Sequence, residues 1–202
     1  MINCDVIIIG AGAAGLLAAI SAGESGKSVL VTEKMNQPGR KLLITGKGRC
    51  NITNSAEIQD FITQIYPDGR FLYPAFKAFF NDDIISLLDE CGLETVLERG
   101  GRYFPKSEKA ADVVEALMKK ARDVGVKFKF DTKVNEIFLD GEKISGVECV
   151  TNGKIEVISV EKIIVCTGGK SYPGTGSTGD GYRWAIRAGH TIENLFPVLV
   201  PL

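Results

Sequence analysis

The stretch between residues 5 and 33 constrains the fold of this chain more than any other. A run of β-branched apolar residues at 6–9 is typical of a strand buried on both faces. An Ala- and Leu-rich run at 16–22 suits a helix, which Gly26 can end. A second apolar run at 29–31 suits another strand. The order strand, helix, strand predicts the first unit of an α/β fold.

Gly10, Gly12 and Gly15 follow the first strand with the spacing G-x-G-x-x-G. The first glycine can make a tight turn, the second lets a pyrophosphate approach the backbone, and the third lets the helix pack close to the strand. Glu33 ends the second strand, near the distance of about 20 residues at which an acid accepts hydrogen bonds from a ribose hydroxyl. Together these features predict a dinucleotide site. The alternatives are a Gly-rich turn that binds nothing and a membrane span over residues 6–22, which the glycine spacing disfavours.

Composition excludes some classes of function. The 202 residues suffice for one domain or one and a half, with 45% apolar content for a core. Lys plus Arg (24) balance Asp plus Glu (25) to a net charge of −1, so nothing global favours nucleic acid or an anionic membrane. Five scattered cysteines without C-x-x-C spacing predict free thiols in a reducing cytoplasm. With one histidine, His190, no zinc site or His-based triad is expected.

A basic, glycine-bearing segment occupies residues 34–54. Beside a phosphate-binding turn, such a segment can neutralise a pyrophosphate and lie along the rest of a cofactor. A solvated basic loop is the alternative. RNA binding is less favoured, because aromatic residues are not interleaved with the charges. The basic residues are Lys34, Arg40, Lys41, Lys47 and Arg49.

Most apolar residues in the middle of the chain are expected to belong to the hydrophobic core. The many aromatic residues at 61–80 are expected to be buried for the most part. Asp82 or Asp83 is expected to cap a helix that runs to Cys91, and Ser107 a second helix that Gly125 stops. Short strands are expected at 93–96 and 101–104.

The last third predicts more sheet. A strand at 126–130 precedes three β segments at 134–139, 144–150 and 155–160, which the hairpin signals Asp-Gly and Asn-Gly separate. The run at 163–166 predicts another buried strand, and a glycine-rich loop follows it at the carboxyl edge of the sheet, where doubly wound folds bind ligands. Thr178 or Asp180 is expected to cap a final helix. The predicted fold class is α/β, a Rossmann-like domain with a central parallel sheet and an antiparallel β-meander crossover.

Three longer motifs resemble a known family. They are Gly39-Arg40-Lys41-Leu42, Thr45-Gly46 with Gly48-Arg49-Cys50-Asn51-Ile52-Thr53-Asn54, and Thr167-Gly168-Gly169-Lys170-Ser171-Tyr172-Pro173 with Gly176-Ser177-Thr178-Gly179. These motifs are similar to a bacterial flavoprotein family described as NAD(FAD)-utilising dehydrogenase, BaiN-type or aminoacetone-oxidase-like, within the two-dinucleotide-binding-domain flavoproteins. The resemblance covers essentially the whole chain.

The resemblance implies FAD as the cofactor, with NAD(P)H as a candidate electron donor. It assigns the helix start to the pyrophosphate, Glu33 to the adenosine ribose, residues 45–51 to the ribityl chain and flavin, and the backbone of Val134 to adenine. It also implies that Lys34, Arg40 and Lys41 flank the adenosine and phosphates and that residues 167–169 pass close to the cofactor. The residues themselves support the glycines and Glu33, whereas the assignments of Val134 and of residues 45–51 rest on the resemblance. The implied cofactor-binding set is Gly10, Gly12, Ala14, Gly15, Glu33, Lys34, Arg40, Lys41, Thr45, Gly46, Gly48, Arg49, Cys50, Asn51, Val134, Thr167, Gly168 and Gly169.

Length is the one large departure from that family, whose members are about twice as long, on the scale of two or three domains. They carry an inserted substrate domain and a return segment that completes the flavin-binding domain. We therefore expect residues 1–202 to form an incomplete FAD-binding domain without these two parts. The apolar ending at 196–202 is expected to lead toward the missing domain and to offer a surface for association.

The predicted function is a cytoplasmic FAD-dependent oxidoreductase, which takes a hydride from a small organic substrate or from reduced nicotinamide. A NAD-dependent Rossmann dehydrogenase and a truncated, non-catalytic flavin-binding fragment are the alternatives. Cys50 has no second cysteine nearby for a dithiol mechanism, and a packing thiol is favoured over a redox residue. The sequence identifies no catalytic residue and no metal site. A small-molecule substrate is expected as partner, without nucleic acid or membrane.

Overall fold

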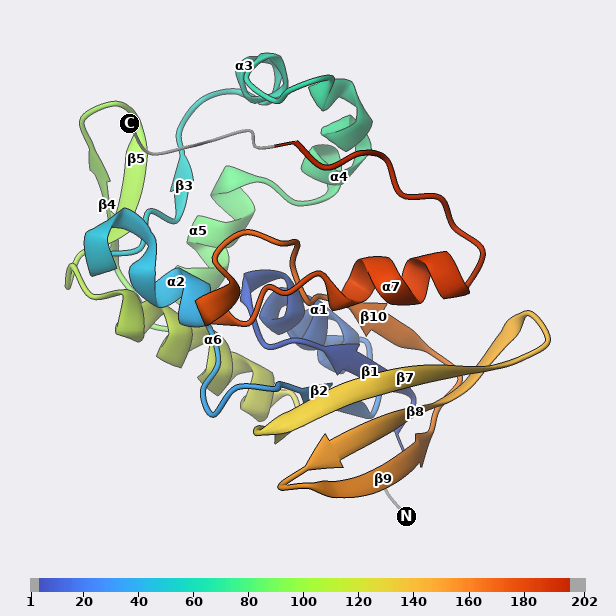
Figure 1. Cartoon of the computed structure of the whole chain (residues 1–202). Helices are drawn as coiled ribbons and strands as arrows, with labels where there is room; N and C mark the ends of the chain where they lie inside the picture. Colours follow the sequence, from blue (N-terminus) through green and yellow to red (C-terminus); the bar gives the residue numbers. More distant parts are fainter. Residues whose placement is uncertain (1–3, 197–202) are drawn as a thin grey trace. The chain divides into compact units, whose positions relative to one another are not determined.

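The computed structural model describes residues 4–196, which form two compact units. The first unit consists of the described residues up to Ile44 together with Leu117–Ile192. The second consists of Thr45–Ala116 and the described residues from Glu193 onward. Figure 1 shows the elements of both. Most of the apolar ending predicted at 196–202 lies outside the described residues.

A parallel sheet with the strand order β10-β1-β2-β6 is the centre of the first unit. Its strands are β1 (Val6–Ile9), β2 (Val29–Thr32), β6 (Lys127–Lys129) and β10 (Ile163–Val165), and every pairing is parallel. Helix α1 (Ala13–Glu24) connects β1 to β2 and ends just before Gly26, whose φ is +73°. Residues of β1 and β2 are buried throughout. The predicted strand–helix–strand unit and parallel sheet are confirmed.

Strand β10 corrects one expectation. The run at 163–166 was predicted to be a buried strand, but Ile164 is 38% exposed and Val165 is 43% exposed. These residues are exposed because β10 is an edge strand, which pairs with β1 alone in the described part of the chain.

The predicted meander is present as three antiparallel strands. They are β7 (Thr132–Asp140), β8 (Lys143–Thr151) and β9 (Lys154–Ser159), in the order β7-β8-β9. The pairing of β7 with β8 is irregular between Val134 and Glu136. Apolar side chains of the meander pack with those of the parallel sheet in one core, which contains Ile7, Ile9, Leu30, Val134, Val147, Cys149, Ile158, Val160 and Trp184.

A glycine-rich loop leads from β10 through the short 3-10 helix η3 (Pro173–Thr175) into α7 (Asp180–Arg187). Gly179, with φ +81°, is the residue that precedes the helix, so the prediction that Thr178 or Asp180 caps it is wrong. The Thr178 hydroxyl instead donates to the Asp180 carboxylate at 2.8 Å. A short helix, α2 (Arg40–Ile44), closes the first segment of this unit.

The second unit contains a small antiparallel sheet with the order β3-β5-β4. Helix α6 (Ala110–Asp123) is divided between the two units after Ala116. The strands are β3 (Thr53–Asn54), β4 (Thr95–Glu98) and β5 (Arg102–Pro105), and the helices are η1 (Thr45–Gly48), α3 (Ile58–Thr63), η2 (Gly69–Leu72), α4 (Tyr73–Ala78), α5 (Asn81–Glu90) and α6 (Ala110–Asp123).

Two helix starts differ from the predictions. Helix α5 begins at Asn81, and Asp83 contributes from within the first turn by accepting the Phe80 N–H at 2.6 Å. Helix α6 begins at Ala110 rather than next to Ser107, because the chain first turns through Glu108, whose φ is +58°.

The aromatic residues at 61–80 are less buried than predicted. Phe61, Phe76 and Phe80 form a cluster with ring centroids 5.0–5.9 Å apart. Tyr66 and Phe71 are instead 78% and 86% exposed. Across residues 4–196, the helices are too short or too polar to cross a membrane.

Candidate functional site

In the glycine turn after β1, two glycines are tightly packed and one borders open space. A Cβ atom at Gly15 would lie 1.9 Å from the Gly10 carbonyl oxygen, and one at Gly10 would lie 2.6 Å from the Cys166 carbonyl oxygen. A Cβ atom at Gly12 would meet no atom of the described residues within 4 Å beyond its chain neighbours. Packing therefore requires glycine at the first and third positions, whereas the second borders open space. The predicted contact of Gly12 with a pyrophosphate stays a prediction, and this open space supports it.

Helix α1 begins at this turn, and its N-terminus has no capping side chain. Gly12 is the residue before the helix, and no side chain among the described residues caps it. The first turn, which contains Ala14, carries no acidic residue. The backbone N–H groups at such an end, together with the helix dipole, favour an anion.

Glu33 is anchored beside this turn by backbone hydrogen bonds. Its Oε2 atom accepts the Ala11 N–H at 2.8 Å, and its Oε1 atom accepts the Met35 N–H at 2.9 Å. Each carboxylate oxygen has a further lone pair, so the group can still accept from ribose hydroxyls. The predicted contact with the ribose stays a prediction, and this geometry supports it.

The glycine-rich loop after β10 packs on itself more than the sequence suggested. Thr167 follows Cys166 beside the Gly10 turn, where the Cys166 N–H donates to the Ile9 carbonyl at 2.8 Å. A Cβ atom would lie 2.8 Å from Ser177 Oγ at Gly168 and 2.9 Å from Tyr182 Oη at Gly169. Gly168 also has a φ of +68°, which favours glycine there without a ligand, and Gly169 packs against Tyr182 of α7.

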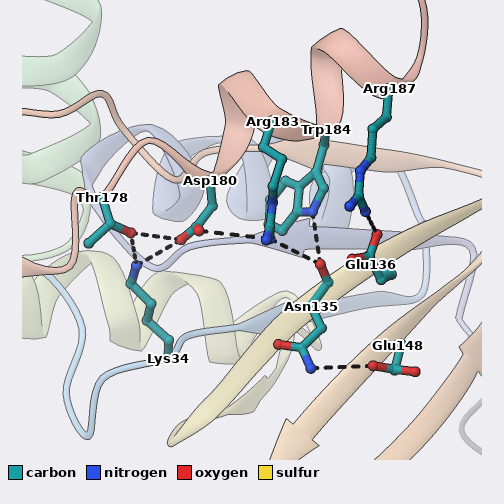
Figure 2. A network of polar contacts seen from close by, with 9 residues as sticks. All are labelled: Lys34, Asn135, Glu136, Glu148, Thr178, Asp180, Arg183, Trp184 and Arg187. Carbon is teal, nitrogen blue, oxygen red and sulfur yellow. Dashed lines mark hydrogen bonds and ion pairs between the residues drawn. The ribbon is translucent and has the colours of Figure 1, made fainter.

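Two predicted basic residues hold this loop. Lys34 Nζ donates to Thr178 Oγ1 at 2.6 Å and to Asp180 Oδ2 at 2.9 Å, as Figure 2 shows. Lys41 Nζ donates to Ser177 Oγ at 2.9 Å and to the Ser171 carbonyl at 3.1 Å. Arg40 is the first residue of α2 and is partly buried.

Sequence reasoning missed the partners of these lysines. It assigned Thr178 and Asp180 only a capping role and gave Ser177 none. The signal available was the placement of hydroxyl and carboxyl groups between glycines in the loop, but their partners lie more than 100 positions away in the chain.

Val134 lies in β7, and the whole residue is only 3% exposed. The predicted contact of its backbone with adenine stays a prediction. Next to it, the Asn135 carbonyl accepts hydrogen bonds from Trp184 Nε1 and from the Arg183 guanidinium, both at 3.1 Å. These bonds fix α7 on β7 (Figure 2).

The remaining predicted residues lie in the second unit, in a turn with an unusual backbone. Positive φ values occur at Gly46, Lys47, Gly48 and Cys50. Such a backbone persists where surrounding contacts hold it. The members of the predicted set in this turn are Thr45, Gly46, Gly48, Arg49, Cys50 and Asn51.

Arg49 makes the contacts that hold the turn. Its guanidinium pairs with Glu98 at 2.8 Å and with Glu108 at 2.9 Å, and it lies 3.9 Å from the centroid of the Phe104 ring. The hydrogen bonds that the guanidinium donates to both glutamates raise the pKa of Arg49, and the bond to Glu98 has the largest effect. All of these contacts lie within the second unit.

Cys50 is a buried thiol, 1% exposed. Burial raises its pKa, which disfavours the reactive thiolate. This geometry supports the packing role over the redox role. None of the five cysteines forms a disulfide.

Two further features concern ligand binding. Residues 4–196 contain no group of three or more His, Cys, Asp or Glu side chains placed to hold a metal ion. A cavity of about 550 Å³ in the second unit has both aromatic and charged walls but none of the predicted cofactor-binding residues. Its lining includes Glu57, Phe76, Lys77, Phe80, Asp82 and Tyr103.

Known proteins resemble the whole described chain. The model of the HI0933-like protein Rossmann domain matches residues 4–195. The chain is 34% identical over 197 residues to the 3-dehydro-bile acid delta(4,6)-reductase of Clostridium scindens, with 96% of this chain and 46% of that protein covered. It is 32% identical over 198 residues to the ribosomal RNA dihydrouridine synthase of Escherichia coli, with 98% and 47% covered.

A solved structure supports the same fold. The open conformation of a flavocytochrome c3 fumarate reductase matches with a TM-score of 0.64 at 18% identity, over 92% of this chain and 40% of that one. The chain spans about half the length of the curated relatives it matches. The predicted α/β Rossmann-like fold class is confirmed. The chain belongs to the HI0933-like proteins, and it carries their FAD-binding Rossmann domain.

Proposed function

We propose that this chain holds FAD as the redox cofactor of an oxidoreductase that takes a hydride from a small organic substrate or from reduced nicotinamide. The observation that carries the proposal is the open space at Gly12, next to the uncapped start of α1 and to the anchored Glu33 carboxylate. FAD supplies reversible hydride acceptance at its N5 atom when it is bound.

The first unit would bind the adenosine and phosphate end of the cofactor. Backbone N–H groups at the start of α1 would hold the pyrophosphate, Glu33 the ribose and the Val134 backbone the adenine. Arg40 and Lys41 would add positive charge near the phosphates, and Thr167–Gly169 would pass close to the cofactor. These roles are chemically suited to the groups, because N–H donors and cations complement phosphates and a carboxylate complements hydroxyls.

The flavin end is assigned to the turn Thr45–Asn51 on the strength of the sequence resemblance. We further propose that residues 1–202 form an incomplete FAD-binding domain, as the sequence resemblance implies. The reducing environment of the cytoplasm suits five cysteines that form no disulfide.

The names of the relatives suggest two classes of substrate. The Clostridium scindens relative is named as a reductase of a bile acid derivative, which favours a small molecule with a conjugated double bond. The Escherichia coli relative is named for ribosomal RNA, which makes RNA the second candidate. The net charge of −1 favours the small molecule, because RNA-binding surfaces are normally basic.

A visible absorption spectrum tests the proposal. The purified chain is mixed with FAD, desalted and scanned, with NAD as the competing ligand in a parallel binding experiment. Retained flavin bands, followed by bleaching with NAD(P)H or a candidate substrate, are the expected result. Binding of NAD without FAD would favour the dehydrogenase alternative. Retained flavin that no donor reduces would favour a non-catalytic fragment.

A further inference from the structure

Lys34 has two partners in the loop that precedes α7 and in α7 itself. Its ammonium group donates to Thr178 Oγ1 and Asp180 Oδ2, and the Thr178 hydroxyl donates in turn to the same Asp180 oxygen. The three groups form the closed triangle at the left of Figure 2. The side chains of Lys34 and Asp180 are only 22% and 17% exposed. Such a shielded, charge-assisted contact is stronger than a surface ion pair.

The rest of α7 is fixed to the meander. Trp184 Nε1 and the Arg183 guanidinium donate to the Asn135 carbonyl. Arg187 forms an ion pair with Glu136, the next residue of β7. Figure 2 shows these contacts along one side of the helix. Asn135 lies at the irregularity of β7, where its carbonyl is directed to α7. The helix is therefore held by β7 along its length and by Lys34 at its start.

The Lys34 contact also determines where the glycine-rich loop lies. Gly176 packs against the Lys34 stem, where a Cβ atom would lie 3.4 Å from Cε. Lys41 holds the same loop through Ser177 and the Ser171 carbonyl. The loop begins at Thr167, beside the Gly10 turn. Displacement of Thr178 and Asp180 would thus free the end of the loop whose start borders the proposed phosphate site.

We propose that Lys34 is a positioning residue, which holds the Thr167–Gly179 loop through Thr178 and Asp180 and does not itself bind the cofactor phosphates. The proposal rests on the proposed FAD function. It differs from the role implied by the sequence resemblance, in which Lys34 flanks the adenosine and phosphates. The two roles make opposite predictions for the partner residue, Asp180.

The decisive variant is Asp180→Asn. If Lys34 positions the loop, loss of the Asp180 charge weakens FAD binding as much as loss of Lys34. If Lys34 is a phosphate ligand, Asp180→Asn releases a cation and removes a nearby negative charge, so FAD binds equally well or more tightly. Glu161→Gln is the matched control, because it makes the same change in net charge at an exposed position of the same unit.

The measurement is a fluorescence titration of FAD into the apo chain at fixed salt. We expect Lys34→Gln and Asp180→Asn each to raise the Kd about tenfold, the typical weight of one charge-assisted contact. The double variant is expected to match either single one, because both changes break the same contact. Lys34→Arg is expected to stay within about threefold of the wild-type chain, since it keeps the charge and the donors, and Glu161→Gln is expected to have no effect.

Other outcomes would overturn either the positioning role of Lys34 or the proposed FAD function. An unchanged or lower Kd for Asp180→Asn, beside a raised Kd for Lys34→Gln, would make Lys34 a direct ligand. A wild-type chain that does not bind FAD would instead refute the proposed function. The positioning role is then decided by amide hydrogen exchange over residues 167–179, which must accelerate in both single variants and not in Glu161→Gln. Unchanged exchange would overturn it.

Discussion

The Glu33 carboxylate accepts a hydrogen bond of 2.8 Å from the backbone N–H of Ala11, the residue between the first two glycines of the fingerprint. This bond joins the end of β2 to the turn after β1. It holds the carboxylate beside the free space at Gly12. A group expected to bind a ribose hydroxyl is thereby placed before any cofactor arrives, which reduces the entropic cost of binding.

We expect Glu33→Gln to raise the Kd for FAD about tenfold, because hydrogen bonds to a carboxylate are about twice as strong as those to an amide. Asp5→Asn is the control. The Asp5 carboxylate also accepts a backbone N–H, that of Ser28 at 2.7 Å, but at the opposite end of the same strands. The measurement is a flavin fluorescence titration of both variants. Equal losses of affinity would show that the effect is a general loss of stability.

Gly12 and Gly15 are expected to separate binding from stability. Gly15→Ala places a methyl group 1.9 Å from the Gly10 carbonyl oxygen, so we expect the free energy of unfolding to fall by about 3 kcal/mol. Gly12→Ala meets no such obstacle and should cost about 1 kcal/mol or less, but its methyl group would occupy the pyrophosphate space and raise the Kd for FAD about tenfold or more. Urea unfolding and FAD titration of both variants check this. Normal FAD affinity in Gly12→Ala would remove the pyrophosphate from this turn.

Local signals were enough to predict the framework of the first unit. The apolar runs on either side of the fingerprint glycines predicted β1, α1 and β2, and the hairpin dipeptides predicted the meander. The sequence could not show that β10 is an edge strand. An apolar run looks the same in the middle and at the end of a sheet, and only the order of the strands decides its exposure.

The partners of the charged residues were beyond sequence reasoning for a different reason. Lys34 and Asp180 are 146 positions apart, and no local pattern links them. Strand β3 has two residues, too few for any periodicity. The basic segment at 34–54 was therefore predicted as a loop from its charges and glycines, whereas the structure gives it two short helices and a strand.

Arg49 is expected to stabilise the turn Gly46–Cys50 through Glu98. Arg49→Gln and Glu98→Gln should each accelerate amide hydrogen exchange in this turn, by roughly two- to fivefold, because they remove the same partly exposed ion pair. Lys47→Gln is the control, since it removes a charge from the same turn at an exposed position. Hydrogen exchange measured by mass spectrometry resolves the segment. Faster exchange in the control as well would attribute the effect to charge in general.

Cys149 is expected to resist alkylation in the folded chain. Its side chain is fully buried, and burial raises its pKa to about 11. The thiolate is the reactive form, so at pH 8 we expect reaction with iodoacetamide to be about a hundredfold slower than in the urea-unfolded chain. Peptide mass spectrometry at several times measures both rates. Rapid labelling of Cys149 in the native chain would show that the core containing Val147 and Ile158 opens easily.

Asp180 should make the stability of the first unit dependent on pH in the acid range. Burial raises the pKa of this carboxyl, but the hydrogen bonds from Lys34 and Thr178 together with the positive charges of Lys34 and Lys133 bring the pKa below its ordinary value of 3.8. A carboxylate whose pKa is lowered by folding stabilises the folded chain above its unfolded pKa, and this contribution is lost as the pH falls through the folded pKa. The free energy of unfolding of the wild-type chain should therefore exceed that of Asp180→Asn by a constant amount above about pH 5, and by less and less below about pH 4. Urea unfolding of both chains between these values measures the difference, and a difference that grows toward acid pH would contradict the Lys34–Asp180 contact.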